Sequence, residues 1–425
     1  MTHLRQLIMS IEFLKRFRTS KTSFTRNRKL NFSSVLILLL QKSVKSLQLK
    51  LNEFVDRIES KEFITASAFC QARRKLLPQA FECLNDVVLN FTYKDQDHKT
   101  FCGFEVIGVD GSDIRLPDSQ SIRDAFGTLK YKAGSVQEEY CSAQFMGVYD
   151  CLNHVALRCN LGKSNVYEVA FFQEILQSQP IIEVKSALFV EDRGFAAYDH
   201  IAWHLQHNHN FVIRLTKQSF SAAQRALADC DFQDDVVLVQ RTGTSKINKK
   251  DVPESLSIRL VKVVLANGTV ELLTTNVTQE QIPTARFKEL YNLRWGIETY
   301  FLIIKERLNL ENFSGTSEQA VMQDFWSTIF LSNLEAFLTQ PAQETLAKKQ
   351  TKNLQRVNNS VAFHAIKERA FDLLTSNIPT EKVLLKLNEL FLLNPTQYRA
   401  NRDRPRNKST KKSLNYCRYR KKLVF

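Results

Sequence analysis

The sequence predicts an α/β protein in which a mixed β-sheet comes from the middle of the chain and helices occupy both ends. Residues 1–100 have apolar spacing of helical type, clearest at 35–47 and 67–75. From residue 104 onward, short apolar runs typical of strands alternate with amphipathic helical segments. Residues 320–395 return to the helical period. This order of elements favours a mixed sheet with helices packed against it.

The elements of the middle region follow from the period of their apolar residues. Strands are expected at 104–110, 186–190 and 211–215, and a hairpin at 144–149 and 154–161. Helices are expected at 166–177, at 196–206 and, as one long helix, from about Ile282 to Leu310. Gly111 and Ser112 are expected to form a turn after the first strand.

Residues 217–268 interrupt the alternation of helix and strand. The segments 236–240, 256–265 and 270–275 are strand-like, and a polar loop at 243–250 separates the first two. We therefore expect a β-rich insertion that ends where 270–275 rejoins the main sheet.

Composition indicates an ordinary soluble, intracellular protein. The chain has 425 residues, of which 44% are hydrophobic and 24% charged. Its longest apolar run, Val35–Leu40, is too short to span a bilayer, and residues 1–20 do not form a secretory signal. The eight cysteines contain no C-x-x-C pair, so reduced thiols are expected rather than a zinc ribbon or a disulfide framework.

The net charge of +15 is concentrated at the two ends of the chain. Residues 1–50 contain eleven Lys and Arg against one acidic residue, and residues 399–425 repeat this balance. The region between them is mildly acidic. Basic extensions around such a body are typical of proteins that bind nucleic acid, although a basic tail can also serve solubility. We expect residues 399–425 to be a flexible tail.

Four functional side chains recur at spacings that place them on one face of the expected long helix. At about 100° per residue, Tyr291, Arg294, Glu298 and Lys305 fall within a stripe about 60° wide. A neighbouring arc is apolar and can pack on a core: Leu293, Ile297, Tyr300, Phe301, Ile304 and Leu308. The plainer interpretation is an amphipathic helix with charge pairs on its solvated face.

Two aspartates upstream change the balance between these interpretations. Asp110 ends the apolar run Glu105-Val-Ile-Gly-Val, and Asp192 ends Ala187-Leu-Phe-Val-Glu. Aspartate is disfavoured within strands, and its burial requires compensation. Together with Glu298, the two would form an all-oxygen site suited to Mg²⁺ or Mn²⁺, with room for two ions roughly 3.5–4 Å apart. Each aspartate considered alone is a turn or cap residue.

These blocks together resemble a known family. Asp110 in Asp-Gly-Ser, Asp192 in Asp-Arg-Gly-Phe, and Tyr-x2-Arg-x3-Glu-x6-Lys from Tyr291 to Lys305 resemble the DDE transposases of bacterial insertion sequences. The unbroken spacing of the third block resembles insertion sequence family 4. The resemblance covers roughly residues 60–345, and the third block is its most specific part.

The resemblance implies a ribonuclease H-like catalytic core interrupted by a β-rich insertion, in agreement with the interpretation of 217–268. It implies that Asp110, Asp192 and Glu298 are the catalytic carboxylates and metal ligands. The implied activity is hydrolytic nicking of double-stranded DNA at inverted-repeat transposon ends, followed by strand transfer of the freed 3′ ends to target DNA. A hairpin intermediate is common in this branch, and a homodimer in the DNA complex is expected. The expected location is the cytoplasm, in association with the nucleoid.

The same resemblance assigns the DNA contacts. Tyr291, Arg294 and Lys305 would hold the transposon end, with Arg294 and Lys305 on phosphates and Tyr291 near a distorted terminus. Trp295, beside the stripe, could stack on an unpaired base, although core packing is the alternative. A catalytically silent DNA-binding repressor and a stand-alone metal-dependent nuclease remain rival functions.

The resulting division of the chain has five parts. They are a helical N-terminal DNA-binding region at 1–100, a first part of the ribonuclease H-like core at 101–216, the β-rich insertion at 217–268, a second part of the core with the catalytic helix at 269–345, and a helical C-terminal region with the basic tail at 346–425.

Other polar residues near these blocks are weaker candidates. Strand alternation turns Glu191 away from the face used by Asp192, and Asp113 lies beyond the expected turn. Four histidines follow the second aspartate at 200, 204, 207 and 209, and the first two have the spacing of helical zinc ligands. The missing H-E-x-x-H motif argues against zinc, and because this helix directly follows the Asp192 block, we expect its polar face to meet solvent. No P-loop motif is present, which argues against ATP dependence.

Overall fold

The computed structural model describes residues 1–26, 28–42, 45–59, 63–94, 98–133, 136–178, 186–241, 252–265 and 268–398. The polar loop expected at 243–250 and the basic tail at 399–425 lie outside the described residues. The chain divides into two compact units. Unit 1 comprises Met1–Thr92, Arg115–Cys141 and Ile303–Phe425, and unit 2 comprises Tyr93–Ile114 and Ser142–Leu302.

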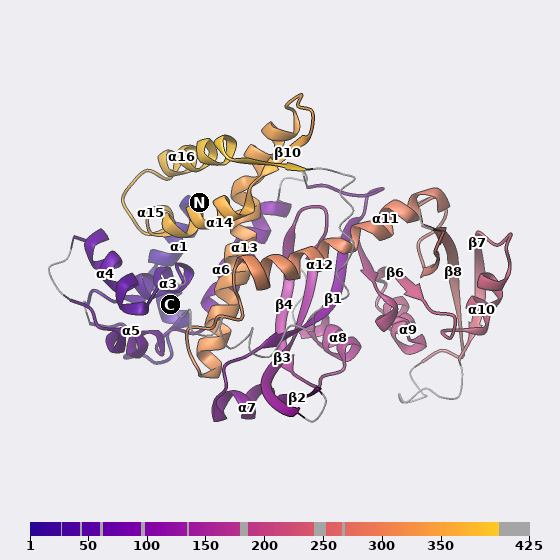
Figure 1. The fold of residues 1–425 in the computed structure, drawn as a ribbon, viewed down its shortest axis with the longest axis horizontal. Helices are drawn as coiled ribbons and strands as arrows, with labels where there is room; N and C mark the ends of the chain where they lie inside the picture. Colours follow the sequence, from indigo (N-terminus) through magenta and orange to yellow (C-terminus); the bar gives the residue numbers. More distant parts are fainter. Residues whose placement is uncertain are drawn as a thin grey trace. The chain divides into compact units, whose positions relative to one another are not determined.

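Unit 1 is mainly helical (Figure 1). Its helices are α1 (Thr2–Met9), α2 (Ile11–Phe17), α3 (Phe32–Leu40), α4 (Leu47–Arg57), α5 (Ala66–Arg73), α6 (Gln79–Tyr93, whose last residue belongs to unit 2), α7 (Gln120–Phe126), α13 (Glu318–Ala347), α14 (Asn359–Glu368), α15 (Ala370–Leu374) and α16 (Thr380–Leu393). Asn31, Ser46, Thr65 and Ser317 begin four of them as caps, because each side chain accepts a hydrogen bond from a backbone N–H of the first turn.

The core of unit 1 forms around α3 and α13. Every residue of α3 from Ser34 to Leu40 is buried, which accounts for its unbroken apolar run. Asp324 of α13 is fully buried and is compensated by Arg73, whose Nη2 lies 3.2 Å from Asp324 Oδ1. Among the described residues, no helix combines the length and apolar character needed to cross a bilayer.

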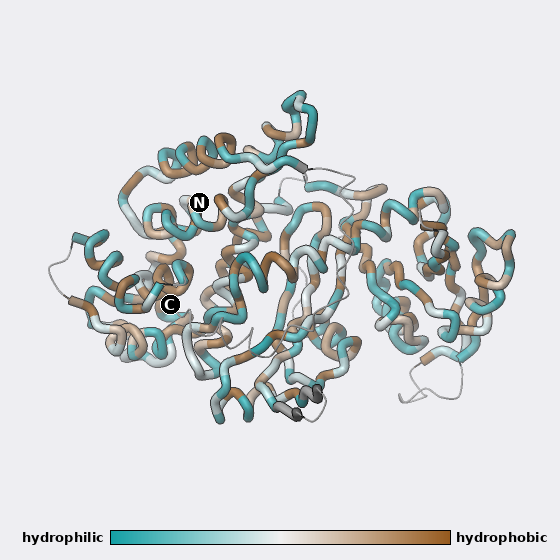
Figure 2. Tube along the Cα trace, viewed as in Figure 1, coloured by the Kyte–Doolittle hydropathy of each residue, from teal (hydrophilic) through white to brown (hydrophobic). Residues whose placement is uncertain are grey.

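The region predicted to be wholly helical after residue 320 also contains two short strands. β10 (Leu354–Val357) pairs antiparallel with β11 (Pro395–Tyr398). Between them, α16 buries Val383, Leu387 and Phe391, and hydrophilic and hydrophobic residues alternate along its trace (Figure 2).

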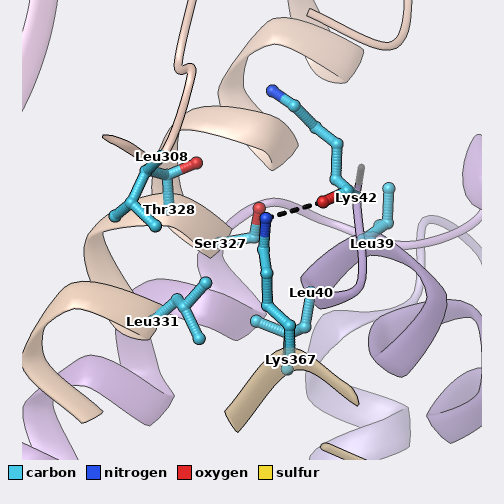
Figure 3. Close-up of a pocket in the computed structure, with 8 residues that line it drawn as sticks. All are labelled: Leu39, Leu40, Lys42, Leu308, Ser327, Thr328, Leu331 and Lys367. Carbon is cyan, nitrogen blue, oxygen red and sulfur yellow. Dashed lines mark hydrogen bonds between the residues drawn. The ribbon is translucent and has the colours of Figure 1, made fainter. Parts of the chain in front are cut away.

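A small cavity of about 10 Å³ lies within unit 1 (Figure 3). Lys367 Nζ donates a hydrogen bond to the backbone oxygen of Lys42 at 2.7 Å. Burial lowers the pKa of Lys367 to about 8. None of the predicted catalytic residues lines this cavity.

Most strands of one sheet lie in unit 2, and the sheet has the order β2-β3-β1-β5-β6-β9-β8-β7, with β4 also paired to β3. The strands are β1 (Glu105–Arg115), β2 (Thr128–Ala133), β3 (Val136–Asp150), β4 (Val155–Lys163), β5 (Ala187–Glu191), β6 (Asn210–Leu215), β7 (Asp234–Gln240), β8 (Ser255–Val264) and β9 (Val270–Thr275). β2 and the first part of β3 belong to unit 1.

Strand direction divides the sheet into regions. β1, β5 and β6 are parallel neighbours, whereas β3 and β4 form the expected antiparallel hairpin. β9 pairs antiparallel with β6 and is followed in the sheet by β8 and β7. The prediction that 270–275 rejoins the main sheet is therefore confirmed, as is a mixed α/β architecture. The predicted turn at Gly111 and Ser112 is wrong, because β1 continues through both residues to Arg115.

Helices of unit 2 accompany this sheet: α8 (Glu168–Ser178), α9 (Tyr198–Gln206), α10 (Ser221–Ala228), α11 (Phe287–Leu293) and α12 (Trp295–Leu302), with short 3₁₀ turns at Arg193–Phe195 and Thr284–Arg286. The single helix predicted from Ile282 to Leu310 is wrong. The α-helix is interrupted at Arg294, between α11 and α12, and α12 is followed by a π-helical turn at Ile303–Arg307. This turn is the first segment after α12 that belongs to unit 1.

α12 packs closely on the sheet because glycines leave room for it (Figure 1). A Cβ at Gly108 would lie 3.3 Å from the Cβ of Ile297, and a Cβ at Gly147 would lie 3.2 Å from the ring of Phe301. Ile297 and Phe301 are both buried. This packing fixes the distance between α12 and the sheet. It therefore also fixes the position of Glu298, which lies between Ile297 and Phe301 in the sequence.

Candidate active site

The two predicted aspartates lie side by side on neighbouring parallel strands, Asp110 within β1 and Asp192 directly after the last residue of β5. Val109 of β1 is the register partner of Glu191 of β5, so Asp110 and Asp192 occupy the next position along adjacent chains. Parallel strands are about 4.8 Å apart. Strand pairing therefore brings together two residues that are distant in sequence.

Each aspartate also makes a local hydrogen bond. Asp110 Oδ1 accepts from the backbone N–H of Gly111 at 2.9 Å. Asp192 Oδ1 accepts from the N–H of Gly194 at 2.7 Å and caps the short 3₁₀ turn that follows. Asp192 thus has the cap role expected of it when considered alone, whereas Asp110 lies within a continuing strand and not in a turn.

Arg294 connects the third predicted carboxylate to the first. Its Nη2 donates to Glu298 Oε1 at 2.6 Å, and its Nη1 lies 3.9 Å from Asp110 Oδ2. The guanidinium is also near the rings of Tyr291, at 5.8 Å, and Trp295, at 5.3 Å. One cation therefore contributes to the charge balance of two of the three carboxylates.

Electrostatic interactions join all three carboxylates. Burial, together with the negative charges of Asp192 and Glu298, raises the pKa of Asp110 to about 6, although Arg294 opposes this rise. Burial raises the pKa of Tyr291 to about 12, and the nearby Arg294 opposes that shift too. The three carboxylates carry more negative charge than the guanidinium of Arg294 can compensate.

The predicted stripe on the long helix is only partly solvated. Tyr291 and Arg294 are 5% and 6% exposed, so the plainer interpretation, in which this face of the helix is solvated, is wrong for these two residues. Trp295 is 45% exposed, which contradicts core packing as its role. Lys305 is half-buried in the π-helical turn and belongs to unit 1, whereas the other predicted site residues belong to unit 2.

Glu168 is an acidic residue near the site that the sequence did not single out. It lies in the first turn of α8 and accepts a hydrogen bond from Gln144 Nε2 at 2.7 Å. Burial and the nearby charges of Asp192 and Asp113 raise its pKa. A Cβ at Gly111 would collide with both Gln144 and Glu168. No local motif marks Glu168, because its position depends on how α8 packs against the sheet.

The three predicted carboxylates do not form a compact metal cage on their own. Among the described residues, the one group of three possible ligands whose ligand atoms all lie within 4.8 Å of one another is Glu191, His200 and His204. A pair of metal ions does not require so compact a set, because two ions roughly 3.5–4 Å apart can share one ligand and take the others on opposite sides.

The histidines after Asp192 differ from expectation. His200 and His204 are 1% and 0% exposed, so the prediction that their helix turns its polar face to solvent is wrong for them. Their Nε2 atoms lie 2.8 Å and 3.0 Å from the carboxylate of the fully buried Glu191. Burial acts to raise the pKa of Glu191, but the two histidines outweigh it and hold the pKa at about 2. As predicted, Glu191 and Asp192 make separate contacts.

Sequence comparison places the chain within a known family. The family model described as the transposase DDE domain matches residues 102–334, which is more than half of the chain. The match spans Asp110, Asp192 and the 291–305 block.

Individual relatives agree with this match. The chain is 21% identical over 295 residues to the transposase InsG for insertion sequence element IS4 of Escherichia coli (strain K12), an alignment that covers 67% of this chain and 64% of InsG. It is 25% identical over 184 residues to a probable transposase for insertion sequence element IS5377 of Geobacillus stearothermophilus, with 43% and 45% covered.

Among solved structures, the chain is similar to the piggyBac transposase in a synaptic complex with hairpin DNA, determined by cryo-electron microscopy. The TM-score is 0.44 and the identity 10%, with 92% of this chain and 85% of the other covered. A score of this size does not establish a shared fold. The sequence matches do establish the family: the chain belongs to the DDE transposases, of the insertion sequence 4 type that its motifs indicated.

Proposed function

We propose that the protein is a DNA transposase that cuts phosphodiester bonds at inverted-repeat transposon ends and joins the 3′ ends to target DNA. The observation that supports this most directly is the pairing of β1 with β5, which sets Asp110 beside Asp192. Arg294 then links Asp110 to Glu298. The proposed catalytic residues are these three carboxylates.

The sheet supports a ribonuclease H-like core. The order β4-β3-β1-β5-β6 combines an antiparallel hairpin with strands parallel to β1 on its other side. β9 rejoins the sheet beside β6, and β8 and β7 lie beyond it and correspond to the β-rich insertion. We propose that this region, and the helical segments before and after the core, retain the five-part division given by the sequence.

The donor set suits a hard divalent cation. Asp110, Asp192 and Glu298 offer carboxylate oxygens, the ligands that Mg²⁺ and Mn²⁺ prefer, and their negative charge exceeds that of the one guanidinium among them. We propose that these residues would hold two ions. Bound there, the ions would polarise the scissile phosphate and the attacking oxygen. The backbone N–H groups of Gly111 and Gly194 fix one oxygen of each aspartate and so limit its rotation.

The surrounding residues support contact with DNA. Trp295, 45% exposed beside Arg294, offers a ring face on which an unpaired base can stack. Arg294 orients Glu298 in this structure, and on DNA it would share its charge with a phosphate. Lys305 is proposed as a second phosphate contact and Tyr291 as a contact near the terminus. The active form is proposed to be a homodimer on two transposon ends.

One experiment separates this function from its rivals. Purified protein is incubated with Mg²⁺ and a mini-element bounded by the inverted repeats that flank its coding region. Excision and insertion support the proposal. Cutting without joining would indicate a stand-alone nuclease, and binding without cutting a silent repressor.

A matched pair of variants tests the carboxylate assignment. Asp192→Asn is expected to abolish cleavage while the protein still binds transposon ends in a gel-shift assay. Asp235→Asn changes an exposed aspartate of β7 and is expected to leave cleavage unchanged. Normal cleavage by Asp192→Asn would contradict the proposal.

A further inference from the structure

We propose that Glu191, His200 and His204 form a second, buried metal site for a divalent transition ion of the zinc class. The three residues lie within unit 2 and all three side chains are completely buried. Glu191 ends β5, and the two histidines are one turn apart on α9, so both imidazoles face the same strand end. The site is separate from the carboxylates proposed for DNA cleavage.

The distances among the three groups favour a cation over hydrogen bonds alone. His200 Nε2 lies 2.8 Å from one Glu191 oxygen, His204 Nε2 lies 3.0 Å from the other, and the two Nε2 atoms are 3.1 Å apart. Three short contacts need three hydrogens, but neutral imidazoles supply at most one at each Nε2. If both nitrogens donate to the carboxylate, each through its own oxygen, the 3.1 Å contact between the two nitrogens is left without a hydrogen. If one Nε2 atom accepts a hydrogen bond from the other, the accepting nitrogen carries no hydrogen and cannot donate to the carboxylate of Glu191.

A metal ion would satisfy all three groups at once, because each would direct a lone pair toward it. Ligands about 2.0–2.1 Å from a tetrahedral ion stand about 3.3 Å apart, close to the separations observed. Two imidazoles and one carboxylate are a borderline donor set, which suits Zn²⁺ better than Mg²⁺. The second carboxylate oxygen of Glu191 would complete the coordination.

The surroundings fit a structural ion. The rings of Phe172, Phe189 and Trp203 pack around the two imidazoles and form a largely apolar shell. The outer nitrogen of His200 lies 3.0 Å from the amide of Gln173, and rotation of that amide presents an oxygen to an Nδ1–H. His204 Nδ1, the ring nitrogen that faces away from Glu191, has no hydrogen-bond partner among the described residues. It therefore favours neither the metal-bound nor the metal-free state.

The consequence of such a site is rigidity at the end of β5. An ion held by Glu191 and α9 would fix the residue immediately before Asp192. We therefore expect zinc to raise the melting temperature of metal-depleted protein more than Mg²⁺ does. The effect requires no DNA and no cleavage.

The test measures metal content of the purified full chain by mass spectrometry. We expect about one Zn²⁺ per chain and at least about tenfold less in the double variant His200→Gln, His204→Gln. Two controls are expected to keep their zinc: His207→Gln, which changes an exposed histidine of the same cluster, and Asp192→Asn, which alters the proposed cleavage site. A folded double variant that retains zinc would overturn the proposal.

Cobalt provides a readout that does not depend on the double variant folding. Metal-depleted wild-type protein is titrated with Co²⁺, and visible absorption bands of a nitrogen-containing site are expected. Bands that persist in Asp192→Asn and in excess Mg²⁺ support the site. Absence of bands, or their loss in Asp192→Asn, would refute it.

Discussion

Arg294 is the residue on which the charge balance of the candidate active site depends. It is 6% exposed, donates to Glu298 and lies 3.9 Å from Asp110. Arg294→Ala should lower the free energy of unfolding by about 2 kcal/mol, because it leaves two carboxylates without their shared cation. Arg294→Lys should fall between the alanine variant and wild type, since lysine keeps the charge but loses the fork of donors. Urea unfolding at pH 7 measures both.

The control for this prediction is Lys45→Ala. Lys45 and Glu53 form an ion pair in which both side chains are substantially exposed, so its removal should change stability little. Equal effects of the two alanine substitutions would show that burial does not strengthen the Arg294 contacts.

Asp110 and Asp113 provide a second comparison at single residues. Asp113 is exposed, and the alternation of β1 turns it away from the face of Asp110. Asp110→Asn should reduce DNA cleavage by more than roughly a hundredfold, equivalent to about 3 kcal/mol of transition-state stabilisation, whereas Asp113→Asn should leave cleavage near wild type. The rate is measured on an end-labelled transposon end. The reverse ranking would reassign the ligand.

Single residues show which local signals sequence reasoning can use and which it cannot. Asp110 and Asp192 could be found because each ends an apolar run, a local signal that survives folding. Glu168 could not, because its neighbours Gln144 and Asp192 belong to other elements. His204 was assigned to solvent because its helix follows a polar block, but its partner Glu191 makes burial acceptable.

At the scale of elements, the packing of α12 on the sheet sets the position of Glu298. Gly147→Ala should lower the free energy of unfolding by about 1–3 kcal/mol, because the added methyl lies 3.2 Å from the Phe301 ring. Phe301→Leu makes space at that point, so the double variant should lose less than the sum of the single variants. Urea unfolding of all four proteins completes the cycle. Strict additivity would mean that the two residues are not energetically coupled.

The long helix α13 carries a buried acid whose protonation should govern stability. Burial raises the pKa of Glu335 to about 8, from an ordinary value of 4.5. The folded chain thus keeps a proton that the unfolded chain releases, and the free energy of unfolding should fall as pH rises from 4.5 to 8, by on the order of 4 kcal/mol. Glu335→Gln should remove this dependence and leave the variant more stable than wild type at pH 8.

Unfolding curves between pH 4.5 and 8.5 test this prediction. Glu344→Gln is the matched control, since Glu344 lies on the same helix but is exposed. If wild type and Glu335→Gln show parallel pH profiles, Glu335 is already ionised in the folded protein.

Periodicity predicted most elements of the sheet, but it could not locate breaks within a regular pattern. Residues 282–310 keep helical spacing throughout, yet the structure interrupts the helix at Arg294 and forms a π-helical turn at 303–307. The π turn alters the angle per residue, so the calculated direction of Lys305 no longer applies. Likewise, Gly111 was predicted to lie in a turn, but it lies within a continuing strand. Glycine is needed there because the side chains of Gln144 and Glu168 occupy the space that a Cβ would fill.

For the whole molecule, the order of the strands in the sheet could not be predicted from the sequence. Strand-like runs at 104–110 and 186–190 were evident, but their pairing is long-range and joins residues that are about 80 positions apart. That pairing creates the candidate site. The return of β9 to β6 was predictable, because 270–275 resumes the apolar pattern of a central strand.

The charge distribution of the whole chain leads to the last prediction. Truncation after Tyr398 removes eleven Lys and Arg and one Asp but preserves the pairing of β10 with β11. The slope of log affinity against log salt falls by about 0.9 for each DNA phosphate that the protein no longer neutralises. The truncated protein should therefore bind DNA more weakly and with a flatter salt dependence, at unchanged melting temperature. Fluorescence anisotropy at several salt concentrations measures this. A full-length variant with the eleven cations changed to Gln should behave like the truncation; if it binds like wild type, chain length rather than charge matters.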